Sequence, residues 1–307
     1  MSANVESMMY VREVPWHGLG RMVEEAPTSK EALEPAGLNW TVSPMPIFDG
    51  HGEEIKGYYA NTRSSDNSVL GIVGSKYTVV QNEEAFDFTD ALIGEGVKYE
   101  TAGSLRNGRT VWLLGRMPER YIVGDKFEPF ICFTNSHDGT SAIRVCMTPI
   151  RVVCNNTLNM ALSGAKRSWH ARHTGNVGAK LEQARQTLKL ADEYLNGLAV
   201  EAEKLAEEKF TLDDAKTTLD KMFVVGKDAS DRQKQTAENA KEEILVCMFR
   251  PDIAKFLNTK WGFMNAVSDY VGHAEPVRRT ANYDENRWGQ IISGHPLLDK
   301  ASMLISA

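Results

Sequence analysis

The sequence predicts an α+β protein in which an antiparallel β-meander packed with helices is followed by a helical C-terminal region. Apolar residues alternate with period two along Val97–Cys154, and an apolar stripe at helical spacing runs along Leu181–Leu205. The part before them is rich in proline and glycine. We therefore expect three regions: 1–75, strands and loops; 76–176, an antiparallel sheet with flanking helices and a basic segment; and 177–307, helices.

The N-terminal region contains short extended runs at Asn39–Val42 and Gly57–Asn61, separated by turn-forming residues. A helix is expected after Asn82, because Asn is a good N-cap and the acidic residues that follow it suit the positive end of a helix. The glycines Gly94 and Gly96 are expected to end this helix.

The sheet is expected to hold about five strands. Arg106-Asn107-Gly108 is a hairpin signal that joins a strand from Val97 to the strand Arg109–Met117. A second hairpin pairs Phe130–Thr134 with Ala142–Met147 across an Asp-Gly turn. We expect a further strand at Ile150–Val153 and a second covering helix at Thr157–Leu162.

The C-terminal region begins with a long helix. Its stripe favours packing within one chain over a self-associating coiled coil. The stripe consists of Leu181, Ala184, Leu188, Ala191, Leu195, Leu198, Ala202 and Leu205. Thr211 opens a capping box, which predicts a helix that continues to Met222. Further helices are expected at Asp231–Phe249, in part of Ile253–Tyr270, and at Pro296–Ile305.

Composition indicates a globular protein, with 42% hydrophobic and 25% charged residues among 307. No window of 18 apolar residues occurs and the first residues do not resemble a signal peptide, so we expect a location in the bacterial cytoplasm. The cysteines show no C-x-x-C spacing and read as small buried residues: Cys132, Cys146, Cys154 and Cys247. We predict no metal site and no cofactor.

Charge is distributed unevenly. The net charge is −6, yet residues 139–181 contain no acidic side chain and carry six cations. With 41 acidic residues in 307, a stretch of this length is expected to hold about six of them. The remainder of the chain therefore sums to −12. One interpretation is a structural run that happens to be apolar and basic, and the other is a surface for phosphates.

Three motifs have both a structural and a functional interpretation. The segment Ser136–Thr140 contains a histidine beside an acid, but a tight turn is favoured over a catalytic pair. Cys154 is favoured as a core residue over a nucleophile. Asn155-Asn156-Thr157 is expected to cap a helix, and capping alone is favoured over an additional role in which its backbone N–H groups bind an anion. No phosphate-binding glycine motif occurs, so nucleotide-driven chemistry is unsupported.

Aromatic residues accompany the basic stretch. Trp169 lies between Arg167 and Arg172, where bases can stack on its ring beside cations. For Trp112, on the preceding hairpin, core packing is favoured.

Several separated blocks resemble a phage/plasmid-like family of unknown function. These blocks are Pro15–Gly20, Tyr77–Phe86, Ala102–Leu105, His137–Gly139, Thr148–Leu158, Arg172–Asn176 and Trp261–Val267. The resemblance implies an origin in a phage, prophage or plasmid, and it assigns no activity to named residues.

At the level of fold, the expected helix, antiparallel meander and second helix beside a basic segment are similar to the core of single-strand annealing proteins, the phage recombinases among them. This resemblance covers Tyr77–Trp169. It implies binding of the DNA backbone and assembly into rings or filaments without nucleotide hydrolysis.

The leading hypothesis is a non-enzymatic phage or plasmid protein that binds and anneals single-stranded nucleic acid, with single-stranded DNA as the expected partner, and that forms homo-oligomers such as rings or filaments. The candidate site residues are Arg106, Arg109, Arg144, Arg151, Asn155, Asn156, Lys166, Arg167, Trp169 and Arg172. One alternative is a counter-defence protein that binds a host protein through its helical region. Another is an enzyme on nucleic acid or nucleotides that uses His137, Asp138 and Cys154.

Overall fold

The computed structural model describes the backbone of residues 5–11, 20–24, 28–90, 97–151, 156–157, 168–273 and 294–306. Side chains are described within these ranges except those of residues 88, 148–151, 156–157 and 180–192. The chain divides into two compact units. Unit 1 comprises Met1–Pro118, Phe130–Met147 and Lys166–Ala191, and unit 2 comprises Glu119–Pro129, Thr148–Ala165 and Asp192–Ala307.

The larger sheet is mostly antiparallel. Its strand order is β11-β10-β9-β7-β6-β1-β2, with β12 also paired to β10 and β8 to β9. Strands β1 and β2 pair in parallel. The pairs β1–β6, β6–β7, β7–β9, β8–β9, β10–β11 and β10–β12 are antiparallel. The bounds are β1 Val5–Tyr10, β2 Arg21–Met22, β6 Lys98–Leu105, β7 Thr110–Arg116, β8 Arg120–Ile122, β9 Asp125–Ser136, β10 Ile143–Arg151, β11 Asn156–Thr157 and β12 Ser168–Ala171.

The two predicted hairpins are confirmed. Strands β6 and β7 meet across a turn in which Arg106, Asn107 and Gly108 all have positive φ, which explains the Asn-Gly sequence. Strand β10 continues without a break to Arg151. Ile150 and Arg151 therefore belong to β10, and the prediction that a separate strand begins at Ile150 is wrong. Residues 152 and 153 lie outside the described ranges.

Strand β1 joins this sheet beside β6, although the sequence places it in a separate N-terminal region. The approach is close: a side chain on Gly103 of β6 would meet the carbonyl of Ser7 and the ring of Trp112. Position 103 therefore requires glycine, because the backbone of β1 and the indole of Trp112 leave no room for a side chain.

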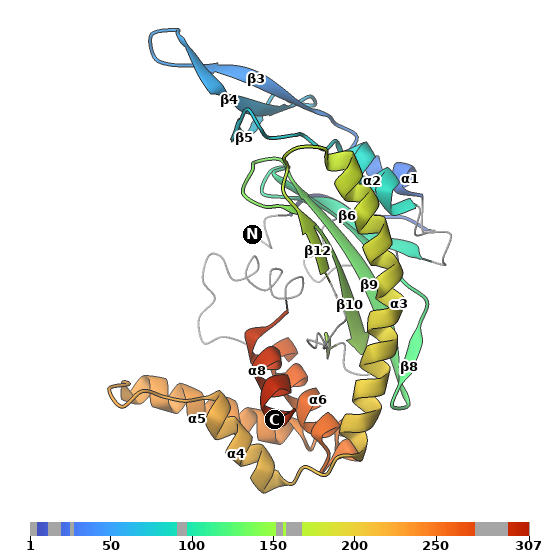
Figure 1. Ribbon diagram of the computed structural model, residues 1–307, viewed down its shortest axis with the longest axis vertical. Helices are drawn as coiled ribbons and strands as arrows, with labels where there is room; N and C mark the ends of the chain where they lie inside the picture. The colour runs from blue at the N-terminus through green and yellow to red at the C-terminus, as the bar shows by residue number, and fades with distance from the viewer. Residues whose placement is uncertain are drawn as a thin grey trace. The chain divides into compact units, whose positions relative to one another are not determined.

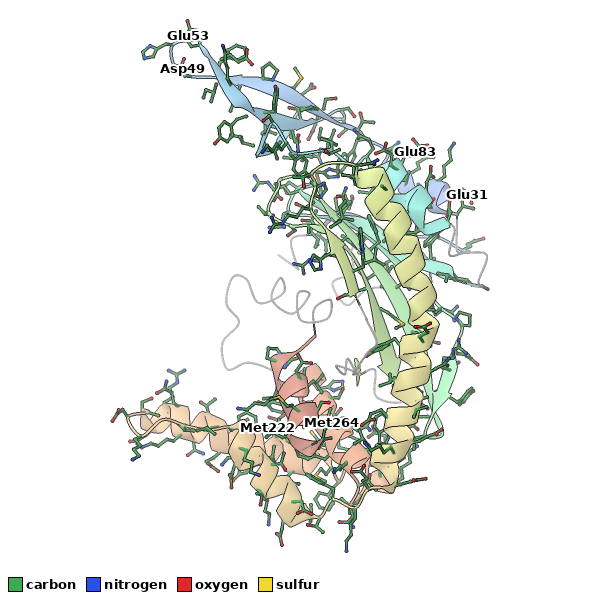
Figure 2. The ribbon with its side chains drawn as sticks, viewed as in Figure 1. Glu31, Asp49, Glu53, Glu83, Met222 and Met264 are labelled. Atoms are coloured by element: carbon green, nitrogen blue, oxygen red, sulfur yellow. The ribbon has the colours of Figure 1, made fainter. Side chains whose placement is uncertain are left out.

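A second sheet is built by β3 Val42–Phe48, β4 Glu54–Arg63 and β5 Val69–Gly74, all antiparallel and in that order. Figure 1 shows β3 and β4 as a hairpin with β5 alongside β4. Asp49 and Glu53 lie at the hairpin tip (Figure 2), where Asp49 accepts hydrogen bonds from the N–H groups of His51 and Glu53. These hydrogen bonds lower the pKa of Asp49 and hold the turn.

Two helices are tied to β6. Helix α1 Ser29–Leu33 has a capping box built on Thr28, and α2 spans Asn82–Asp90. The hydroxyl of Tyr99 on β6 bonds to Thr89 (2.6 Å) and to the carboxylate of Asp90 (3.0 Å), which also accepts from the N–H of Ser29 (2.9 Å). One carboxylate therefore connects both helices to the sheet.

The helix after Asn82 is confirmed, but the cap assigned to Asn82 is wrong. Gln81 precedes the helix: its N–H donates to the carboxylate of Glu84 (3.1 Å), and its carbonyl accepts from Ala85 (2.9 Å). The amide of Asn82 is used in long-range contacts instead. Gly94 and Gly96, predicted to end the helix, lie outside the described residues.

The predicted C-terminal helices are confirmed. They are α3 Val177–Glu207, α4 Leu212–Met222, α5 Asp231–Cys247, α6 Lys260–His273 and α8 Pro296–Ile305, with a short 3-10 helix at Ala254–Phe256. Within unit 2, Leu195, Leu198, Ala202 and Leu205 of the predicted stripe are buried. Trp261, Phe263 and Met264 of α6 are fully buried, and Figure 2 labels Met264 and Met222 in this helical unit.

In the parts of the chain that the structure describes, no helix is both long enough and apolar enough to cross a bilayer.

The capping box of α4 generates a stability prediction. Thr211 accepts from the N–H of Asp214 (3.2 Å), and the Asp214 carboxylate accepts from the N–H of Thr211 (2.8 Å). We expect Thr211→Ala to lower the free energy of unfolding by about 1 kcal/mol, measured by urea denaturation. The control Thr217→Ala removes an exposed mid-helix hydroxyl and should change it by less than about 0.5 kcal/mol. Equal effects of the two substitutions would contradict the role of the cap.

Candidate functional site

The basic residues of β10 and β12 form a cross-strand pair in unit 1. Arg144 lies directly opposite His170, and both side chains are exposed. Their neighbours in register, Ile143 opposite Ala171, are buried and point to the other face of the sheet because successive side chains alternate. The pair therefore presents an arginine and a histidine on one face at the margin of this sheet.

Further cations lie at the same end of the sheet. Arg172 is exposed and follows β12 directly. Arg109 is exposed in the turn between β6 and β7, and its carbonyl accepts from the N–H of His137 (2.8 Å) in the turn that leads to β10. We call Arg109, Arg144, His170 and Arg172 the basic end of the sheet.

Arg106 and Asp138 connect these turns electrostatically. The guanidinium of Arg106 donates to the hydroxyl of Thr110 (2.8 Å). Burial raises the pKa of Asp138, but hydrogen bonds from Ser136 and Thr140 outweigh it, and the charge of Arg106 adds to them, so the net pKa is lowered. Asp138 is thus an ionised carboxylate that holds its own turn, within the field of one arginine.

Trp169 lies on the other face of β12. It is opposite Val145, which is buried, and its own side chain is half-buried. The structure therefore does not bring Trp169 together with Arg144 and His170, its neighbours along the strands. Trp112 is buried, and its indole N–H donates to the hydroxyl of Thr101 (3.1 Å), as core packing predicts.

The remaining predicted site residues lie elsewhere or are not described. Arg151 ends β10 and pairs with Asn156 of β11, and only the backbone of both is described. The helix predicted from Thr157 does not begin there, because Asn156–Thr157 forms an antiparallel strand with Ile150–Arg151. That strand pairing takes the place of the anion-binding helix terminus expected at this point. Asn155, Lys166, Arg167, Cys154 and residues 158–162 fall outside the described ranges.

A buried polar cluster supports the basic end. The Nε2 atom of His137 lies 2.9 Å from Oδ1 of Asn82, whose Nδ2 donates to the carbonyls of Leu38 (3.0 Å) and Trp40 (3.4 Å). Since Nδ2 is the donor of that amide, Oδ1 accepts, and the proton of the imidazole is on Nε2. The amide of Asn61 donates to the carbonyl of His137 (2.7 Å). His137, Asn61 and Asn82 are all buried.

The neighbouring segment Tyr77–Val80 is hydrogen-bonded to β9 and to His173, which follows β12. The hydroxyl of Tyr77 donates to the carbonyl of Ser136 (2.5 Å), and its ring stacks on His173 at 4.6 Å between centroids. The N–H of Thr78 donates to the carbonyl of His173 (2.8 Å), and Nδ1 of His173 donates to the carbonyl of Thr78 (3.1 Å). The blocks Tyr77–Phe86, His137–Gly139 and Arg172–Asn176, which are separate in the sequence, therefore meet in space.

This geometry bears on the enzymatic alternative. The imidazole of His137 is fully buried and bonds to Asn82, while the carboxylate of Asp138 bonds to Ser136 (2.5 Å) and Thr140 (2.6 Å). Histidine and acid thus act separately as structural groups of a turn. No group of three potential metal ligands occurs among the described residues.

Sequence reasoning missed two parts of this site. His170 is absent from the predicted site residues, although the strand register places it opposite Arg144. Asn61 belongs to a strand that is distant in sequence, so only long-range pairing brings it to His137. Arg63 of the same strand bonds to Glu6 (2.8 Å) and Asp66 (2.6 Å), which raises its pKa.

A family model described as a domain of unknown function (DUF932) matches residues 69–289. No curated protein matches the chain. No solved structure matches it either.

The burial of His137 generates a pH prediction. Burial, with a smaller contribution from the nearby His173, lowers the pKa of His137 to about 3. The unfolded chain, with a histidine pKa near 6.5, binds the proton more readily than the folded chain does. The stabilisation is therefore complete above about pH 6.5 and is lost as the pH falls toward 3, at up to about 1.4 kcal/mol per pH unit.

Urea denaturation between pH 5 and pH 8 measures this slope. We expect His137→Gln to flatten the decline in the free energy of unfolding below about pH 6.5, since glutamine does not titrate. His51→Gln, which changes an exposed histidine, should keep the slope of the unmodified protein. An unchanged slope in His137→Gln would show that another group is responsible.

Proposed function

The chain belongs to a family of unknown function (DUF932), and we propose from the site described above that it binds and anneals single-stranded DNA through the basic end of its sheet. The observation that carries the proposal is the exposed cross-strand pair of Arg144 and His170, with Arg172 and Arg109 at the same end. Arginine matches phosphate geometry through several N–H donors, and the imidazole of His170 can donate a further hydrogen bond.

The structural context supports a role in binding phosphates. The turn that carries Arg109 and the turn that leads to Arg144 on β10 are linked by the hydrogen bond from the His137 N–H to the Arg109 carbonyl (2.8 Å), which supports the backbone beside both cations. The acid-free stretch 139–181 includes three of the four residues of the basic end. Within that stretch of the sequence no carboxylate accompanies the cations, as suits a surface for phosphates.

In this proposal the contacts go to phosphates and carry no sequence preference. Stacking on Trp169 is not part of the surface, because that ring lies on the opposite face of β12. Binding is then governed mainly by salt, as expected when cations replace the counterions of a nucleic acid.

Self-assembly completes the proposal. A chain of net charge −6 presents a local cluster of cations against a remainder of −12. Joining several copies multiplies the cluster and raises the effective concentration of cations along one strand. Annealing proteins use such assemblies, and the resemblance to them and to phage/plasmid-like proteins supports a mobile-element protein acting in the bacterial cytoplasm.

Fluorescence anisotropy with a labelled single-stranded oligonucleotide at several salt concentrations tests the proposal. We expect Arg144→Gln to lower the slope of log affinity against log salt concentration by about 0.7, because one phosphate contact is lost. Lys56→Gln removes an exposed cation from the smaller sheet and serves as the matched control, with an unchanged slope. Trp169→Ala should also leave the slope unchanged.

Duplex DNA and RNA of the same length form the comparison arms. Tighter binding of single strands, together with faster pairing of complementary strands in the presence of the protein, agrees with the proposal. Absence of binding at low salt, or equal effects of Arg144→Gln and Lys56→Gln, would exclude the basic end as a nucleic-acid surface.

A further inference from the structure

The smaller sheet in unit 1 has one buried and one exposed face. Asn61, Arg63 and Val73 point to the buried face. On the other face, Met45 lies opposite Ala60 and Ala60 opposite Ile72, in one row across the three strands. Met45 is 50% exposed and Ile72 is 60% exposed.

Two more apolar side chains share the exposed face. Tyr58 precedes Ala60 by two residues and is 54% exposed, and Val69 pairs with Thr62 and is also 54% exposed. A monomer rarely leaves so many large apolar side chains on one small sheet without a partner. The exposed face is therefore apolar as far as Ile72 on the outer strand β5.

The two edges of this sheet differ. The N–H of Ser75 donates to the carbonyl of Gly57 on β4. In an antiparallel ladder every second residue pair is hydrogen-bonded. The backbone groups of Val73 and Gly71 therefore also form their hydrogen bonds with β4. The N–H and carbonyl of Ile72 then point away from β4, to the free edge of β5. Among the described residues no strand pairs with that edge.

The edge formed by β3 is closed by its sequence. Along β4, a residue whose backbone groups form hydrogen bonds with β5 has none to spare for β3. Asn61 and Tyr59 are two such residues, and Pro44 and Pro46 of β3 lie opposite them. The prolines thus occupy the positions whose N–H groups would point outward. Because proline has no N–H, β3 cannot accept a further strand there. Strand β5, with the sequence VLGIVG, contains neither proline nor charge.

We propose that a second copy of this chain pairs with β5 antiparallel across a two-fold axis at Ile72, which joins two three-stranded sheets into one of six strands. The strand is self-complementary in this register: each Ile72 exchanges both backbone hydrogen bonds with the other, and Leu70 meets Gly74. The apolar row Met45, Ala60, Ile72 then continues directly into the same row of the second copy.

Charge favours antiparallel pairing of the two β5 strands over parallel pairing. Lys76 follows β5 and is exposed, whereas Asp66, which precedes β5, is ion-paired with Arg63. A parallel pair in register would place the two lysines together, and an antiparallel pair separates them. This inference names the surface for the assembly in the proposed function, but it does not depend on nucleic-acid binding.

Light scattering of the full chain without nucleic acid tests the pairing across micromolar concentrations. We expect a dimer mass for the unmodified protein, and a dissociation constant raised by roughly tenfold or more in Ile72→Lys, which places two like charges at the axis. Met45→Lys is the matched control, because it adds the same charge to the same exposed face at the closed edge. It should remain dimeric.

Crosslinking gives an independent readout. In the proposed pair the two Cα atoms of residue 72 lie about 5.5 Å apart, within reach of a disulfide. Mild oxidation should link Ile72→Cys into a covalent dimer and leave Met45→Cys at the level of the unmodified protein. A monomeric mass throughout, equal disruption by Ile72→Lys and Met45→Lys, or no crosslink at Cys in position 72 would each overturn the pairing. Since both measurements omit DNA, failure of DNA binding leaves their outcome unaffected.

Discussion

The hydrogen bond between Nε2 of His137 and Oδ1 of Asn82 is the contact on which the arrangement of unit 1 depends. Asn82 starts α2 and also donates to the carbonyls of Leu38 and Trp40, so three segments distant in sequence converge on one amide. Asn61 on β4 connects the smaller sheet to this cluster, because its amide donates to the carbonyl of His137. The buried imidazole is tolerated here because it is neutral and its Nε2–H has an acceptor in Asn82, whereas its Nδ1 and the Oδ1 of Asn61 are buried without a hydrogen-bond partner.

This buried cluster explains where the cations lie. His137 is the first residue after β9, and the turn that it begins leads directly to Arg144 on β10. Its own N–H holds the carbonyl of Arg109 in the neighbouring turn. Arg109 thus lies in a turn and Arg144 near the start of a strand, and the hydrogen bond from His137 supports the backbone beside both. In the proposed function this support reduces the conformational freedom lost when an anion binds.

The sequence predicted those parts of the fold that depend on local pattern. The Asn-Gly turn predicted the β6 and β7 hairpin, and the Thr211 capping box predicted α4, because each signal lies within a few residues. Long-range pairing was not predictable in this way. The faces of Trp169 and His170 depend on the register between β12 and β10, and a shift of one residue would exchange them. Pro44 and Pro46 indicated loops, whereas their spacing of two residues suits the outward positions of an edge strand.

The two surfaces of unit 1 have different consequences for assembly. A two-fold contact at β5 is isologous: it uses the same patch on both copies and closes at a dimer. Such a dimer carries two basic ends related by the two-fold axis, so the protein's affinity for one long strand rises through effective concentration without any new contact. A ring or filament of the kind formed by annealing proteins requires in addition a heterologous contact between dimers. In the proposed assembly the open edge of β5 doubles the basic end, and continuous coverage of a strand depends on a second, separate interface.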